Sequence, residues 1–173
     1  MTNEAEPLTL VLVGPMAAGK TSVGRRVARA LGVSFIDTDK RIAAEHGPIP
    51  VIFEQHGERR FRELERDAVA AALAEGGVIS LGGGAVTDPR TRQLLTRHPV
   101  VFLTVSEDAV AERLGGGGGR PLLTGDDPVE RWKRIFAERR HLYQEVAAAT
   151  FDTSRRPMQR IADEIASWRR EQR

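Results

Sequence analysis

The chain has 173 residues, and its 26 Lys and Arg residues nearly balance 24 Asp and Glu residues, so the formal net charge is only +2. It contains no cysteine, which excludes a disulfide framework and cysteine metal sites. No apolar run approaches the ~18 residues of a membrane-spanning helix. We therefore expect a single cytoplasmic domain with its own hydrophobic core and with neither a nucleic-acid nor a membrane partner.

Short apolar runs, suited to buried strands, alternate along the chain with longer segments of helical spacing. This alternation predicts an α/β fold, in which helices cover both faces of a parallel sheet. The expected strands cover residues 8–13, 34–36, 78–81, 100–105 and 150–151. The expected helices cover residues 20–31, 39–46, 59–74, 90–97, 107–114, 128–148 and 157–170, with a further helical turn at 51–55.

The segment from Gly14 to Thr21 matches the pattern G-x-x-x-x-G-K-[ST] between the first strand and the first helix. That context is typical of a phosphate-binding loop, whose backbone N–H groups surround an anion at a helix N-terminus. All but three of the basic residues of the chain are Arg, yet Lys20 stands at the motif position. We predict that Lys20 reaches the β- and γ-phosphates of a nucleotide and that the Thr21 hydroxyl binds Mg²⁺.

Asp37 and Asp39 come where the second strand ends, at the rim of the sheet that also holds the phosphate-binding loop. One carboxylate beside Mg²⁺ and one beside a substrate hydroxyl would divide the work between them. The alternative is that Asp39 only caps the helix that follows. The spacing alone leaves both interpretations open.

Three glycines, Gly82, Gly83 and Gly84, follow the third strand at the same rim and would let a ligand touch the backbone. An anionic acceptor would also need arginines able to grip a carboxylate. Arg62 and Arg139 are candidates, although the sequence alone does not choose which arginines do this. The four histidines show no metal-binding spacing.

Five consecutive glycines at 115–119 lead to Arg120. A stretch of this composition has little intrinsic conformational preference, so it is expected to be mobile in the free protein. Its position beyond the fourth strand, and the lone arginine that ends it, favour a closing lid over residues 114–127 rather than a plain surface linker.

Taken together, these motifs resemble the shikimate kinase family. The resemblance runs from about Leu8 to Trp168 and rests on the order of six short motifs. They are the phosphate-binding loop, Asp37-Thr38-Asp39, Phe61-Arg62-x-x-Glu65, Ser80-Leu81-Gly82-Gly83-Gly84-Ala85, Arg120-Pro121-Leu122-Leu123 and Arg139-x-x-Leu142-Tyr143. It implies a three-layer P-loop kinase fold with a five-stranded parallel sheet in the order 2-3-1-4-5, phosphorylation of the 3-hydroxyl of shikimate by ATP, and a monomer.

The resemblance also implies residue roles. Asp39 would bind the shikimate hydroxyls and assist deprotonation, with Lys20 and Arg120 as the other catalytic groups, while Asp37 and Thr21 would serve Mg²⁺. The segment at about 39–66 would hold the substrate. The implied substrate residues are Asp39, Phe53, Phe61, Arg62, Glu65, Gly82, Gly83, Gly84 and Arg139. The implied ATP-binding residues are Gly14, Ala17, Ala18, Gly19, Lys20, Thr21, Ser22, Arg113, Arg120, Arg156 and Pro157.

Three alternatives remain open from the sequence. The first is a kinase of the same fold that acts on another small polyol acid, such as gluconate. The second is a nucleotide-gated regulatory module, which would leave Asp39 and the three glycines without a role. The third is a nucleic-acid-binding protein, which the small net charge and the few aromatic residues disfavour.

Overall fold

The computed structural model describes residues 7–115 and 127–173. Its centre is a five-stranded, all-parallel sheet in the order β2-β3-β1-β4-β5, as the resemblance implies. The strands are β1 (Thr9–Val13), β2 (Phe35–Asp37), β3 (Gly77–Ser80), β4 (Val100–Thr104) and β5 (Ala149–Asp152). The helices are α1 (Lys20–Leu31), α2 (Thr38–His46), α3 (Ile49–Glu75), α4 (Pro89–Leu95), α5 (Glu107–Gly115), α6 (Pro128–Val146) and α7 (Met158–Glu171).

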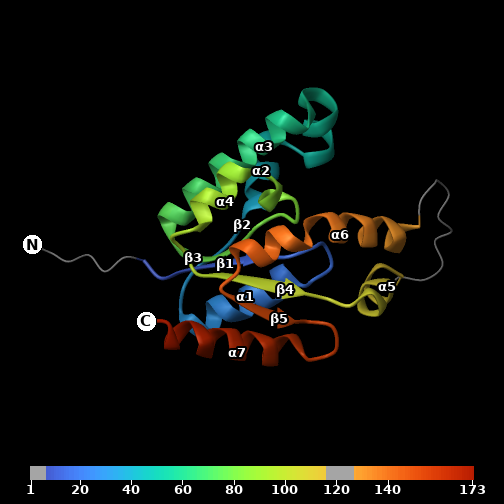
Figure 1. Cartoon of the computed structure of the whole chain (residues 1–173). Coiled ribbons are helices and arrows are strands. Elements are labelled where there is room, and N and C mark those ends of the chain that lie inside the picture. Colours follow the sequence, from blue (N-terminus) through green and yellow to red (C-terminus); the bar gives the residue numbers. More distant parts are fainter. Residues whose placement is uncertain (1–6, 116–126) are drawn as a thin grey trace, which may run out of the picture.

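Two helical layers enclose this sheet, with α1 and α7 on one face and α3, α4 and α6 on the other (Figure 1). Successive side chains of β1 point to opposite faces of the sheet. Leu10 and Leu12 therefore pack in the hydrophobic core between the sheet and α1 and α7, while Val11 and Val13 pack in the core on the other face. All four are at most 1% exposed. The continuous apolar run at residues 8–13 is therefore explained by burial on both faces of the sheet.

The boundaries predicted from the sequence differ from the structure mainly in α3. This helix runs from residue 49 to residue 75, but Gly57 has a φ of 78° and divides it into two parts at a kink. The first part contains the predicted helical turn at 51–55, and the second contains the predicted helix at 59–74. A 3-10 helix at Ala85–Thr87, which the sequence pattern did not predict, follows the three glycines.

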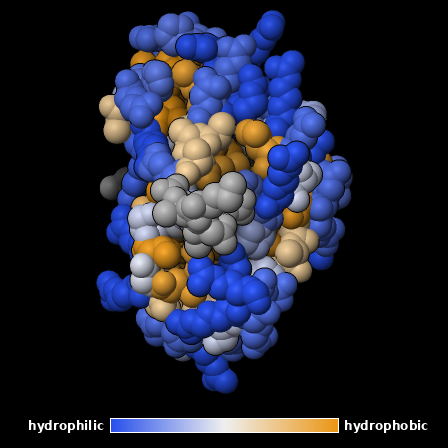
Figure 2. Space-filling view, turned by 90° about the vertical axis from the view of Figure 1, so that its left-hand side faces the viewer, coloured by the Kyte–Doolittle hydropathy of each residue, from blue (hydrophilic) through white to orange (hydrophobic). Residues whose placement is uncertain are grey.

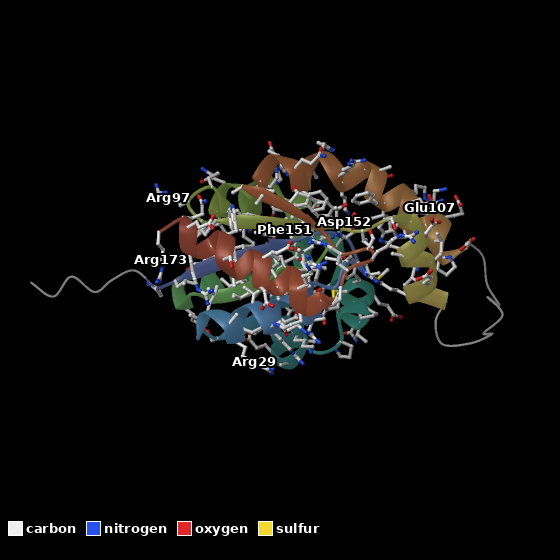
Figure 3. All side chains as sticks on the ribbon, turned by 90° about the horizontal axis from the view of Figure 1, so that it is seen from below. Arg29, Arg97, Glu107, Phe151, Asp152 and Arg173 are labelled. Carbon is white, nitrogen blue, oxygen red and sulfur yellow. The ribbon has the colours of Figure 1, made fainter. Side chains whose placement is uncertain are left out.

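The carboxyl ends of the strands all meet at one edge of the sheet, which lies on the right in Figure 1. The opposite edge carries the C-terminus, and the surface there is mostly hydrophilic with separate hydrophobic patches (Figure 2). Seen from below, Glu107 lies at the end of the molecule where the strands have their carboxyl ends, and Arg173 lies at the opposite end (Figure 3). Within the described residues, no helix is both long and apolar enough to cross a membrane.

Candidate active site

The carboxyl edge of the sheet contains a cavity of about 1060 Å³. The phosphate-binding loop forms one side of it, and residues from the ends of β2 and β3 form another. Helix α6 completes the wall with Arg139 and other side chains. The cavity thus brings together the following predicted site residues: Ala17, Gly19, Lys20, Thr21, Ser22, Asp37, Asp39, Gly82, Gly83, Gly84 and Arg139.

The loop between β1 and α1 has the backbone of an anion-binding turn. Gly19, the N-cap of α1, has a φ of 85°, and Ala17 has a φ of 68°, a left-handed conformation that L residues adopt at a cost. At Gly14 an added Cβ would collide with the carbonyl oxygen of Leu103 in β4. The glycines at both ends of the loop are therefore required by close approach and by backbone conformation.

Lys20 folds back across this loop. Its Nζ donates to the carbonyl oxygens of Gly14 and Pro15, at 2.7 and 2.9 Å. Burial lowers the pKa of Lys20 to about 8, although the nearby carboxylates of Asp39 and Asp37 partly oppose that shift. A nucleotide phosphate would give this desolvated ammonium a charged partner in place of the two carbonyls.

Asp37 lies beside the start of α1. Its Oδ2 accepts a hydrogen bond from the Thr21 hydroxyl at 3.3 Å, and its Oδ1 accepts one from the backbone N–H of Lys40 at 3.1 Å. Asp37, not Asp39, is therefore the N-cap of α2, so the alternative role of Asp39 as a helix cap is wrong. The reason is that α2 begins at Thr38, which places Asp39 in its first turn with a carboxylate free to face the cavity.

The carboxylate of Asp39, unlike that of Asp37, has an oxygen without a hydrogen-bond partner in the described residues. This oxygen, Oδ1, is buried. Burial, together with the negative charge of Asp37, raises the pKa of Asp39, and the positive charges of Lys20 and Arg62 oppose this. An added Cβ on Gly82 would lie 2.6 Å from that oxygen, so only glycine leaves room for the carboxylate.

Arg62 is held on α3 by a carboxylate one helical turn away. Its Nη1 donates to Glu65 Oε1 at 2.7 Å, and Glu65 is only 1% exposed. Burial raises the pKa of Glu65, while the charge of Arg62 opposes the rise. The Nε of Arg62 is buried without a partner in the part of the chain that the structure describes, and its Nη2 would lie 2.5 Å from a Cβ on Gly84.

The two phenylalanines implied by the family resemblance pack beside this arginine. The rings of Phe53 and Phe61 lie 4.7 Å apart, and the Arg62 guanidinium lies 5.2 Å from the centre of the Phe61 ring. Phe61 is buried among Ile42, Ile52 and Leu64, whereas Phe53 is 37% exposed. Neither ring lines the main cavity, so the structure places the phenylalanines next to the site rather than inside it.

On the opposite wall, α6 contributes Arg139 and, one helical turn later, Tyr143. The Tyr143 hydroxyl donates to the carbonyl oxygen of Gly83 at 2.5 Å. Burial raises the pKa of Tyr143 to about 12, so this hydroxyl stays protonated and can donate at neutral pH. Sequence reasoning gave Tyr143 no role, although its spacing from Arg139 places both residues on one helix face.

The remaining residues that the resemblance assigns to ATP are more dispersed. Arg113 donates from Nη1 to the carbonyl oxygen of Ala17 at 2.6 Å, which ties it to the phosphate-binding loop. Arg156 pairs with Glu164 at 2.6 Å, and with Pro157 it lines a separate cavity of about 500 Å³. Arg120 and most of the expected lid at 114–127 lie outside the described residues.

The described residues would supply only some of the ligands of a bound Mg²⁺. No group of three or more histidine or acidic side chains that could hold a metal occurs in residues 7–115 and 127–173. The Thr21 hydroxyl and the Asp37 carboxylate do lie together at the mouth of the phosphate-binding loop. This small set of hard oxygen donors fits Mg²⁺, which usually keeps several waters and takes its other ligands from substrate phosphates.

Comparison with known proteins finds relatives over most of the chain. A family model described as shikimate kinase matches residues 16–170. A shikimate kinase of Mycobacterium avium (strain 104) is 49% identical over 148 residues, which is 84% of either chain. A shikimate kinase of Corynebacterium efficiens is 44% identical and covers 93% of this chain and 95% of its own.

A solved structure extends the similarity to three dimensions. The shikimate kinase of Acinetobacter baumannii in complex with shikimate superposes with a TM-score of 0.84 at 34% sequence identity. The match covers 96% of this chain and 95% of the other.

Proposed function

This chain belongs to the shikimate kinase family, so its reaction is the ATP-dependent phosphorylation of shikimate, and we propose that the residues around the main cavity divide that reaction between a nucleotide end and an acceptor end. Phosphoryl transfer asks a protein mainly to position two substrates in line and to neutralise charge on the transferred group. The cavity meets both needs because a buried ammonium and a buried carboxylate face it.

At the nucleotide end, the backbone amides from Ala17 to Ser22 surround the phosphates at the N-terminus of α1. Lys20 moves from its two carbonyl partners to the β- and γ-phosphates and neutralises the charge that develops there. Thr21 and Asp37 would hold Mg²⁺, which supplies further charge neutralisation when it is bound. Arg120 would add a second positive charge to the phosphates, a role that rests on the family resemblance.

At the acceptor end, the observation that carries the proposal is the Oδ1 of Asp39, which is buried and has no hydrogen-bond partner among the residues that the structure describes. A substrate hydroxyl that donates to this oxygen would satisfy it and would be oriented for attack on phosphorus, with Asp39 as the base. Arg139, which lines the cavity from α6, and Arg62, which Glu65 orients, would together grip the substrate carboxylate. The backbone at 82–84 would complete the pocket, and the ring of Phe61 beside Arg62, with Phe53 packed against it, would support the acceptor end from outside the cavity.

A coupled assay of ADP release with different acceptors tests this function. We expect shikimate to stimulate ADP release strongly, and we expect gluconate and the absence of an acceptor to give only basal hydrolysis. Stimulation by gluconate instead would identify a kinase of another polyol acid. Hydrolysis that no acid changes would favour a nucleotide-gated module. A monomeric, cytoplasmic enzyme remains our expectation, and light scattering on the purified protein would measure its oligomeric state.

Replacing Arg139 by Lys is expected to raise KM for shikimate about tenfold or more while leaving KM for ATP unchanged. Lysine keeps the positive charge but loses the planar, two-pronged grip on a carboxylate, and one charge-assisted hydrogen bond contributes about 1.5–3 kcal/mol. Steady-state kinetics with each substrate varied in turn measures the effect.

The matched control for this prediction is Arg140→Lys. Arg140 is the next residue on α6 and is exposed, with its guanidinium 5.9 Å from the Phe136 ring. This substitution should change neither KM. An Arg139→Lys enzyme with an unaltered KM for shikimate would remove Arg139 from the acceptor site.

A further inference from the structure

Three successive carbonyl groups of the phosphate-binding loop are each held by a side chain from a different part of the fold. The indole Nε1 of Trp132 donates to the carbonyl oxygen of Met16 at 2.8 Å. Arg113 donates to that of Ala17 at 2.6 Å, and the hydroxyl of Thr153 donates to that of Ala18 at 2.7 Å. The donors come from α6, from α5 and from the residue that follows β5.

These three donors are themselves firmly placed. Trp132 is 5% exposed and stacks on Phe136, with ring centres 4.9 Å apart. Thr153 is 1% exposed, and its own carbonyl and hydroxyl oxygens both accept hydrogen bonds from Arg113. Each donor is therefore oriented by packing or by a second hydrogen bond before it meets the loop.

Holding a carbonyl also fixes the amide that follows it. Because a trans peptide unit is planar, its C=O and N–H point in opposite directions. Fixing the carbonyls of Met16, Ala17 and Ala18 thus fixes the directions of the N–H groups of residues 17, 18 and 19, of which that of Ala18 donates to the carbonyl oxygen of Pro15 at 3.3 Å. The left-handed backbone of Ala17 is strained for a residue other than glycine, so it persists only when its surroundings hold it.

We propose that Trp132 and Thr153 are positioning residues for nucleotide binding, which hold the loop carbonyls outward so that the loop amides are aimed at the phosphates before ATP arrives. This inference rests on the proposed function of the loop. Preorganised amides bind an anion more tightly because the ordering cost is met during folding rather than during binding. Arg113 belongs to the same network, but the family resemblance also places it at ATP directly, so Trp132 and Thr153 give the cleaner tests.

Two substitutions each remove the group that donates to the loop with little change in shape, and Thr153→Val also removes the hydroxyl contacts with Thr104 and Arg113. Trp132→Phe removes the indole N–H and keeps an aromatic ring against Phe136, and Thr153→Val removes the hydroxyl and keeps the branched side chain. We expect the Kd for ADP with Mg²⁺, measured by calorimetry, to rise about three- to tenfold in each variant. KM for shikimate should stay unchanged, and Thr153→Ser should restore the ADP affinity because it returns the hydroxyl.

Trp168→Phe is the matched control, since Trp168 is the second of the two tryptophans and lies on α7. It should leave the ADP affinity unchanged. It also leaves Trp132 as the sole tryptophan, and because Trp132 both lines the cavity and donates to the loop, its fluorescence should shift when ADP binds. This measurement uses the native hydrogen bond and does not depend on the folding of the other variants.

Unchanged ADP affinity in either Trp132→Phe or Thr153→Val would overturn the proposal. So would a parallel loss of ADP and shikimate affinity together with a lower melting temperature, since that pattern reports general destabilisation. Failure of the proposed function would look different, because the unaltered chain would then bind ADP but show no shikimate-dependent turnover, or would bind no ADP at all.

Discussion

Replacing Asp39 by Asn should lower kcat about 10²- to 10⁴-fold while leaving the Kd for ADP close to that of the unaltered enzyme. The amide can still occupy the space beside Gly82, but it cannot accept the proton of the attacking hydroxyl. Phosphate binding depends on the loop and on Lys20, so it should survive. Single-turnover kinetics and calorimetry with ADP measure the two effects separately.

The pH dependence gives Asp39→Asn a second signature. Because burial and Asp37 raise the pKa of Asp39, the acid limb of kcat/KM should lie above the usual carboxyl range and should vanish from the residual activity of the variant. A raised carboxyl pKa means that the folded protein binds this proton at a higher pH than the unfolded chain does. Ionising Asp39 therefore costs stability as the pH rises through the folded-state pKa, and the variant should melt at a higher temperature at pH 7.

Asp67→Asn is the control for this change, because Asp67 is exposed on α3 and does not line the main cavity in the described part of the chain. It should leave turnover, the pH profile and the melting temperature unchanged. If the Asp39→Asn enzyme turned over shikimate at nearly the normal rate, Asp39 would not be the base.

Replacing Lys20 by Met should lower kcat about 10²- to 10³-fold and should weaken ADP binding as well. The ammonium is buried, so its charge acts on the phosphates with little screening by water. Lys133→Met is the matched control: Lys133 lies on α6 and pairs with Glu107 at 3.1 Å. Calorimetry and steady-state kinetics on both variants compare the two lysines, and an equal effect would remove Lys20 from the phosphate site.

The lowered pKa of Lys20 also predicts how nucleotide affinity changes with pH. In the empty loop its pKa is about 8, and a bound phosphate raises the pKa by stabilising the charged form. The complex then holds more protons than the empty protein above this pH, so ADP affinity should fall as the pH rises through about 8. Calorimetry in buffers of different ionisation enthalpy should detect the proton uptake, and the Lys20→Met variant should not show it.

The sequence determined the features that depend on neighbouring residues. The loop from Gly14 to Thr21 was recognisable because its glycines, lysine and hydroxyl are fixed at short spacing between a strand and a helix. The contact of Arg62 with Glu65 follows from their separation by one helical turn. The order of the short motifs carried the family resemblance, and that resemblance implied the strand order; the comparisons confirm the family and the sheet topology confirms the strand order.

Only the tertiary structure decided which distant side chains support these local motifs. Trp132 meets Met16 across 116 residues, Thr153 meets Ala18 across 135, and Tyr143 meets Gly83 across 60. The local pattern gave none of these residues a contact, even Tyr143 within its motif, because a buried Trp, Thr or Tyr looks the same in sequence whatever it contacts. Their donors reach the site only because the parallel sheet brings the carboxyl ends of β1, β3, β4 and β5 to one edge, where α6 packs against β4 and the 3-10 helix that follows β3.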